Sequence, residues 1–214
     1  MLLKFCIISS ILLNGIIAHT NPRIYLVRHA TVALEKPGWG TSKNSSKYKA
    51  AYNVAGVEAF NPEGVLQKVA DYEKLDTVFC SPQPRAQETA EILLSGNAVL
   101  KIDSTLSELD YQVVQVPVIQ LPVKGWLFIS RVAWMAGINK GEKSGYRERI
   151  DELNTFTDEL TAFAHRNGWA LVVAHGMVNR ELIKILKYRG WEYSEDGNDG
   201  FGNLSVNCLE KIHP

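Results

Sequence analysis

The chain has 214 residues, of which 46% are hydrophobic and 21% are charged. This length and composition are typical of one soluble globular domain and exclude a disordered or fibrous protein. Because 23 basic and 23 acidic residues leave no net charge, no broad positive field is expected, which argues against nucleic acid or an anionic membrane as a partner.

Residues 1–20 form an N-terminal segment of distinct composition. Lys4 precedes an apolar stretch from Phe5 to Ile17, and the small residue Ala18 follows it. This order is typical of a secretory signal peptide, and the stretch is short and interrupted for a membrane-spanning helix. We expect residues 1–20 to be a cleaved signal, residues 21–214 to form a single domain, and the mature protein to be secreted or periplasmic. An uncleaved anchor or an N-terminal core helix is the alternative.

Short apolar segments alternate with amphipathic ones along the rest of the chain. The expected strands are residues 23–28, 77–80, 98–102, 169–174 and 205–212. The expected helices are residues 84–94, 146–166, 177–188 and a helix that begins at 61–63 and continues to about residue 75. This alternation predicts an α/β fold with three layers, in which helices cover both faces of a mostly parallel central sheet.

Two segments do not follow the alternation. Residues 31–60 are polar and contain glycines, and residues 111–139 hold Trp126, Trp134 and several apolar runs. Both segments are expected to be insertions that could cover a site. The two tryptophans are expected to pack in a satellite core rather than to contact a ligand, because large aromatic side chains are mostly buried.

Cys80 and Cys208 are the cysteines that follow the predicted signal. Two cysteines in an exported chain could pair, but cysteine is also a common small residue of protein cores. We expect these two to be unpaired core thiols.

Arginines and histidines follow three of the predicted strands. Arg28 and His29 come at the end of the first strand, Arg85 follows the second, and His175 follows the strand that ends at Ala174. Loops at the carboxyl ends of parallel strands converge on one crevice. Guanidinium groups are planar and permanently charged, which suits them to phosphate oxygens. The sequence therefore predicts a phosphate site at this edge of the sheet.

Three segments around these residues resemble the histidine phosphatase superfamily, also called the phosphoglycerate mutase-like fold. IYLVRHA at residues 24–30 resembles the family's Arg-His hallmark, CSPQPRAQETA at 80–90 its arginine-bearing second signature, and VVAHG at 172–176 its third. The resemblance spans about residues 23–210. It implies a phosphoglycerate mutase-like fold and phosphoryl chemistry that needs neither a cofactor nor a metal.

The resemblance also implies a role for each matched residue. His29 would be the nucleophile and form a transient phosphohistidine. Arg28 and Arg85 would hold the phosphoryl oxygens and neutralise charge in the transition state. His175 would donate a hydrogen bond to the phosphoryl group, for which the protonated ring is best suited. Gly176 would allow the backbone to approach the phosphate at a helix N-terminus.

An acid and further donors complete the implied site. Glu108 matches the position of the family's general acid, and Asp110 is the alternative. Thr31, where many relatives have another polar or acidic residue, could donate its hydroxyl to the phosphate. Four further arginines could extend the anion site, although such residues more often lie solvated on helix faces: Arg131, Arg147, Arg149 and Arg180.

These expectations describe an enzyme that hydrolyses a small-molecule phosphomonoester, with no nucleic-acid partner and no membrane partner after signal cleavage. The glycine-rich, arginine-bearing loops that shape the site of the family's mutases are not evident between Thr31 and Phe60. Hydrolysis is therefore favoured over a phosphomutase. A non-catalytic phosphate-binding module is the third alternative, and the presence of both His29 and Glu108 argues against it.

Overall fold

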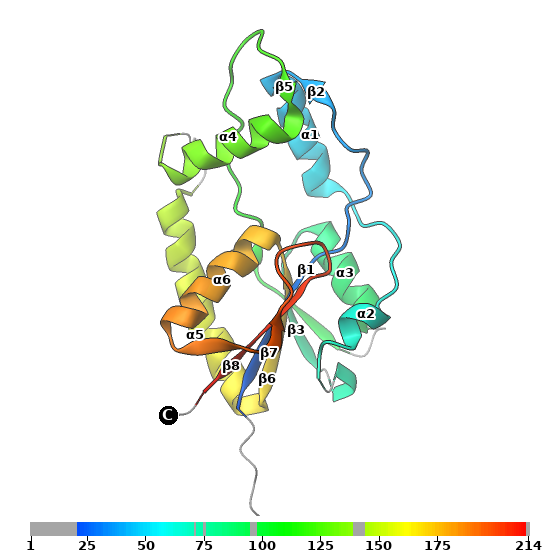
Figure 1. Ribbon diagram of the computed structural model, residues 1–214, viewed down its shortest axis with the longest axis vertical. Coiled ribbons are helices and arrows are strands. Elements are labelled where there is room, and N and C mark those ends of the chain that lie inside the picture. The colour runs from blue at the N-terminus through cyan, green and yellow to red at the C-terminus, as the bar shows by residue number, and fades with distance from the viewer. Residues whose placement is uncertain (1–20, 71, 75, 95–97, 139–143, 213–214) are drawn as a thin grey trace, which may run out of the picture.

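The computed structural model of the protein describes residues 21–70, 72–74, 76–94, 98–138 and 144–212, so the predicted signal segment lies outside the described residues. A six-stranded sheet in the order β4-β3-β6-β1-β8-β7 forms the centre of the molecule, and β2 and β5 pair in a small second sheet (Figure 1). The strands are β1 (Arg23–Arg28), β2 (Trp39–Gly40), β3 (Thr77–Cys80), β4 (Val99–Ile102), β5 (Leu121–Pro122), β6 (Trp169–Ala174), β7 (Trp191–Asn198) and β8 (Val206–Lys211). The helices are α1 (Ser42–Val54), α2 (Glu63–Leu66), α3 (Pro84–Leu94), α4 (Val123–Met135), α5 (Tyr146–Asn167) and α6 (Gly176–Tyr188), with 3-10 turns η1 (Tyr72–Lys74) and η2 (Ser104–Leu106).

The main sheet is parallel over four of its strands. β1 pairs in parallel with β6, β6 with β3, and β3 with β4, whereas β8 runs antiparallel to β1 and β7 antiparallel to β8. The carboxyl ends of β1, β3 and β6 therefore lie side by side. The prediction of an α/β fold with a mostly parallel sheet is confirmed.

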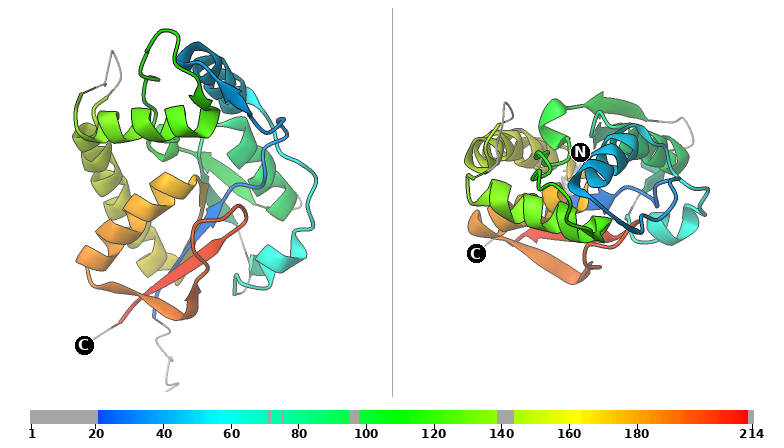
Figure 2. Two further views of the ribbon diagram at one scale, coloured as in Figure 1. Left: turned by 45° about the horizontal axis from the view of Figure 1, so that its top comes forward. Right: turned by 90° about the horizontal axis from the view of Figure 1, so that it is seen from above.

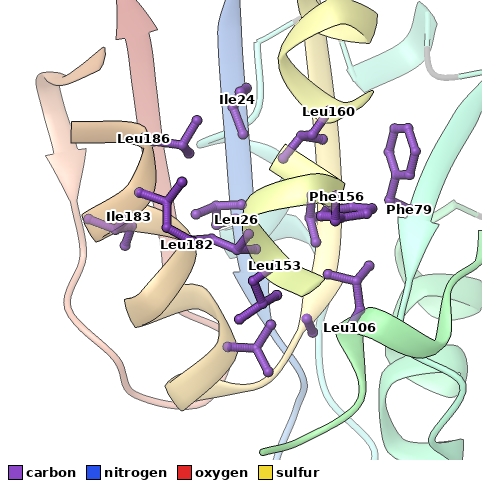
Figure 3. Packing of buried hydrophobic residues seen from close by; sticks show 14 of the residues in the cluster. Ile24, Leu26, Phe79, Leu106, Leu153, Phe156, Leu160, Leu182, Ile183 and Leu186 are labelled. Carbon is purple, nitrogen blue, oxygen red and sulfur yellow. The ribbon is translucent and has the colours of Figure 1, made fainter. Parts of the chain in front are cut away.

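Helices cover both faces of this sheet because its central strands are apolar on both sides. Ile24 and Leu26 of β1 belong to the core under α5 and α6, which Figure 3 shows. Tyr25 and Val27, which point to the other face, belong to a second core with residues of α2 and α3. The alternation along β1 thus joins two cores across one sheet.

One predicted helix is wrong, and several elements were not predicted: α1, α4, β2 and β5 in the two irregular segments, and the edge strand β7. The polar strand β7 was not predicted, because WEYSEDGN lacks an apolar run and pairs only with β8 at the edge of the sheet. The prediction of a helix from residue 61 to about 75 is wrong, since α2 ends at Leu66. Lys68 and Val69 donate to carbonyls three residues back, and the Ala70 N–H donates to the Tyr25 hydroxyl at 3.3 Å instead of to a helix carbonyl.

The two irregular segments lie together beyond the carboxyl ends of the parallel strands. We call residues 36–57 and 111–138 the cap; it contains β2, α1, β5 and α4 (Figures 1 and 2). Trp126 and Trp134 are buried, and the Trp126 indole donates to the Gly40 carbonyl at 3.0 Å. The prediction that these tryptophans are buried is therefore confirmed, but Trp134 packs in the main core with residues of β1, α5 and α6 rather than in a satellite core.

Cys80 and Cys208 are both buried and unpaired, as predicted. Within the described ranges, no helix has both the length and the hydropathy that crossing a membrane requires.

Candidate active site

His29 follows β1 directly and is fully buried. Its backbone N–H donates to the Ala174 carbonyl at 3.0 Å, which joins the end of β1 to the end of β6. Its Nδ1 lies 2.7 Å from the Ala30 carbonyl oxygen. A carbonyl can only accept, so Nδ1 carries the hydrogen and the lone pair is on Nε2. Burial lowers the pKa of His29 to about 3, and the charges of Arg85 and Arg28 act in the same direction, so the ring is neutral.

Arg85 lies in the first turn of α3 and is also fully buried. Its Nε donates to His29 Nε2 at 3.3 Å, its Nη1 to the Tyr52 carbonyl at 3.1 Å, and its Nη2 to Gln83 Oε1 at 3.1 Å. The Tyr52 ring centroid is 4.7 Å from its guanidinium carbon, which adds a cation–π contact. Burial lowers the pKa of Arg85, but an arginine keeps its charge in proteins.

Arg28 ends β1 beside the start of α6. Its Nη1 donates to the Phe201 carbonyl, and its Nε is buried without a hydrogen-bond partner among the described residues. A Cβ at Gly176 would lie 3.3 Å from Arg28 Nε and 3.4 Å from its Cδ. Glycine at this position therefore leaves room for the Arg28 side chain.

His175 is the N-cap residue of α6 and has no exposed surface. Its Nε2 lies 2.8 Å from Ser81 Oγ, which also accepts from the Gln83 N–H at 3.4 Å. When the Ser81 hydroxyl donates to Nε2, the ring hydrogen is on Nδ1, which faces Glu108 Oε2 at 3.8 Å. Burial lowers the pKa of His175 well below its ordinary value, and Arg85, His29 and Arg28 lower it further. This corrects the expectation of a protonated His175, because desolvation favours the neutral ring.

Glu108 follows η2 and directs its carboxylate toward His175. Oε2 lies 3.8 Å from His175 Nδ1, and Oε1 lies 3.9 Å from Arg131 Nη2 and is buried without a hydrogen-bond partner in the described chain. The Glu108 backbone N–H donates to Gln83 Oε1 at 3.0 Å. The same Gln83 oxygen therefore accepts hydrogen bonds from Arg85 and from the Glu108 loop.

Asp110, the alternative acid, has other partners. It forms an ion pair with Lys49 and accepts from the Tyr111 N–H at 2.9 Å. Asp110 is thus tied to the cap by Lys49, whereas the Glu108 carboxylate lies beside His175.

Thr31 does not reach the site. Its side chain is exposed, its carbonyl accepts from the Glu58 N–H at 2.8 Å, and the next residue, Val32, forms a β-bridge with Val57. The chain therefore turns toward residues 56–58 directly after Ala30. The expected contact between the Thr31 hydroxyl and the phosphate is not supported.

A cavity of about 520 Å³ lies between the cap and the end of the sheet. Its lining includes Arg28, Arg85, Glu108 and Gly176, whereas His29 and His175 lie behind this lining. Arg131 and Arg180 also line it. Arg149 instead supports the Glu108 loop, because its Nη2 donates to the Thr105 and Ser107 carbonyls at 2.8 and 3.3 Å.

Several residues of the site were not singled out from the sequence. Ser81 and Gln83 stand in the second signature beside Arg85, so their place next to a phosphate site was a usable signal. Phe201 and Asn203 reach the site from the loop between β7 and β8, and Asn203 Nδ2 donates to the His29 and Ala30 carbonyls, both at 3.0 Å. No local pattern marks that loop. Of the described residues, no three His, Cys, Asp or Glu side chains form a group that could hold a metal ion.

Residues 24–213 match the family model described as "Histidine phosphatase superfamily (branch 1)". A comparison with curated proteins found no match. Among similar solved structures is a phosphoglycerate mutase from Bacillus anthracis str. Sterne, 16% identical, with a TM-score of 0.56 and 90% of each chain covered. A mycobacterial glucosyl-3-phosphoglycerate phosphatase is 16% identical, with a TM-score of 0.52 over 87% of this chain and 89% of that one. The product of an open reading frame of Mycobacterium tuberculosis is 19% identical, with a TM-score of 0.51 over 90% and 93%. At these identities the likeness shows the fold, which is phosphoglycerate mutase-like.

Proposed function

The chain belongs to the histidine phosphatase superfamily, branch 1, and we propose that it hydrolyses a small phosphomonoester through a phosphohistidine on His29. The observation that carries this proposal is the tautomer of His29. The Ala30 carbonyl, 2.7 Å from Nδ1, fixes the ring hydrogen there and leaves the lone pair on Nε2. A neutral imidazole with its lone pair beside two arginines is an activated nucleophile for a phosphate dianion.

In the first step, His29 Nε2 attacks phosphorus. The Arg85 Nε–H, which donates to Nε2 at 3.3 Å, donates to a phosphoryl oxygen instead when substrate binds. The Nε2 lone pair is then free to attack. The N–P bond forms, the bond from phosphorus to the ester oxygen breaks, and the leaving oxygen takes the proton of Glu108. The products of this step are a free alcohol, a phosphohistidine and a Glu108 carboxylate.

In the second step, water regenerates the enzyme. The Glu108 carboxylate removes one proton from a water molecule, whose oxygen attacks phosphorus as the N–P bond breaks. Inorganic phosphate leaves, His29 is neutral again and Glu108 is protonated. The arginines and the Nδ1–H of His175 hold the oxygens throughout, so the negative charge meets fixed donors in both steps.

Phosphate release from a generic aryl phosphate tests the proposal. The full chain is assayed with a chelator present, beside His29→Gln and the matched control His165→Gln, which changes an exposed histidine of α5. We expect undiminished activity with the chelator and in the control, and a loss of about a thousandfold or more in His29→Gln. Wild-type activity in His29→Gln would refute the mechanism.

Two further assays separate the alternatives. A bisphosphate donor offered with an acceptor gives an isomerised product only if the protein is a phosphomutase. Binding of phosphomonoesters without hydrolysis across a panel would instead indicate a non-catalytic phosphate-binding module.

A further inference from the structure

We propose that the substrate is a phosphomonoester lipid, and that the cap lies on the anionic membrane surface that contains it. That the substrate carries a phosphomonoester group rests on the function proposed above. That the substrate is a lipid is inferred from the surface of the cap, which is apolar, positively charged and continuous with the cavity.

The cap exposes an unusual amount of apolar surface. It makes up about a quarter of the described residues, yet it holds nine of the sixteen exposed large hydrophobic side chains among them. These nine are Trp39, Val54, Val118, Ile119, Phe128, Ile129, Val132, Met135 and Ile138. Soluble proteins seldom leave such a group uncovered, and a group of this kind marks an interaction site.

The exposed face of α4 is the centre of this surface. Trp126 and Trp134 are on the buried side of α4, and Phe128, Val132 and Met135 follow one another along the opposite side at helical spacing. Trp39 pairs with Pro122 just before α4 begins and is 73% exposed. A helix with a wide apolar face and a tryptophan at its end is typical of segments that lie in a membrane interface.

This surface continues into the cavity through Phe128. Its ring lines the cavity and is still 69% exposed, and it lies one helical turn from Val132. Leu127 lines the same wall, and Met177 and Phe201 line the cavity from α6 and the loop after β7. Figure 1 shows α4 above α6. His175 and Gly176 stand at the start of α6. A lipid held by its phosphate therefore has an apolar path from the catalytic groups to the outer face of α4.

The charge of the cap suits an anionic membrane. Its 50 residues include Lys36, Lys43, Lys47, Lys49, Lys124 and Arg131 and contain neither Asp nor Glu, although the whole chain has no net charge. Lys49 and Arg131 face carboxylates of the cavity, but the other four lysines are exposed. We expected no membrane partner because the chain as a whole has no net charge. That sum combines the positive charge of the cap with the negative charge of the rest of the chain. Clustered lysines beside apolar side chains are attracted to anionic lipid.

A second copy of the chain fits this surface less well. A protein seated on the exposed face of α4 would cover Phe128, which lines the cavity. A membrane that supplies the substrate from the same side has no such conflict.

The test compares one phosphate chemistry in two settings. The full chain is given vesicles of phosphatidylcholine and phosphatidic acid, whose headgroup is a phosphomonoester, and separately a soluble aryl phosphate. Phosphate release and cosedimentation with the vesicles are measured. The variant Ile129→Gln/Val132→Gln changes two exposed side chains of α4 that do not line the cavity, and glutamine keeps the helix favourable. The control Ile92→Gln/Tyr188→Gln changes two exposed apolar residues outside the cap.

We expect the wild type and the control to bind the vesicles and hydrolyse the lipid. The α4 variant should lose both by about tenfold or more, because two apolar side chains no longer enter the bilayer, while its rate on the aryl phosphate is unchanged. Both variants keep the apolar residues 1–20. A difference in vesicle binding between the two variants therefore comes from the cap.

Three results would overturn the inference. One is equal vesicle activity in the two variants, and another is hydrolysis of the aryl phosphate but not of the lipid by the wild type. The third is a dimer that the α4 variant dissociates while the wild type ignores vesicles, which would make this face an interface between copies. If neither substrate is hydrolysed, the proposed function fails together with the lipid assignment.

Discussion

The buried, neutral state of His29 should make the stability of the protein depend on pH. The pKa of His29 is about 3 in the folded protein, against 6.5 for an ordinary histidine. The unfolded chain therefore takes up the proton first, and the stability contributed by the neutral ring is fully present above about pH 6.5 and is lost as the pH falls toward 3. Each pH unit in this window removes about 1.4 kcal/mol for one group. At pH 4.5 the loss from His29 is about 3 kcal/mol.

Urea unfolding of the wild type and of His29→Gln at pH 7 and pH 4.5 measures this contribution. The variant lacks the titrating ring, whereas the carboxylates and His175 titrate in both proteins. We expect the wild type to lose about 3 kcal/mol more than the variant between the two pH values. Parallel losses in the two proteins would refute the burial of a neutral His29.

Two further changes test how the arginines are positioned. Gln83→Leu removes the oxygen that accepts from Arg85 Nη2 and from the Glu108 N–H, and we expect kcat/KM to fall about ten- to a hundredfold. Gln83→Glu keeps an acceptor and should retain more activity in steady-state kinetics, so equal losses would contradict this role. Gly176→Ala places a Cβ 3.3 Å from Arg28 Nε and should raise KM about tenfold, since 1.4 kcal/mol of lost phosphate binding is a factor of ten. Because alanine favours a helix, the thermal midpoint should not fall; an unchanged KM would show that Arg28 has room to move.

The central sheet and four residues of the site were predictable because local sequence specifies them. Arg28 and His29 follow a strand that is apolar on both faces, which is the pattern of a buried parallel strand. Arg85 and His175 follow strands of the same kind, so the topology alone brings these side chains to one edge of the sheet.

Other parts were hidden because they depend on contacts between distant segments. β7 is polar and is defined by its pairing with β8. Asn203 contacts His29 from a loop, and Tyr52 contacts Arg85 from α1 in the cap, and no local pattern specifies where either segment lies. The net charge likewise concealed the cationic cap, because a sum over the chain carries no information on position.

Some expectations from the sequence stay predictions. Cleavage of residues 1–20 and export of the protein concern a segment outside the described residues. The roles of His29, Glu108 and His175 as nucleophile, acid and donor are proposals that the geometry supports.

The most direct test of the central claim is detection of the covalent intermediate. The full chain is mixed with a fast-reacting aryl phosphate and quenched in alkali, which preserves phosphohistidine, and its peptides are then examined by mass spectrometry. We predict the mass of one phosphoryl group on the peptide that contains His29, localised to that residue and absent when substrate is omitted. Turnover with no phosphorylated His29 at any quench time, or a phosphoryl group on another residue, would contradict the account.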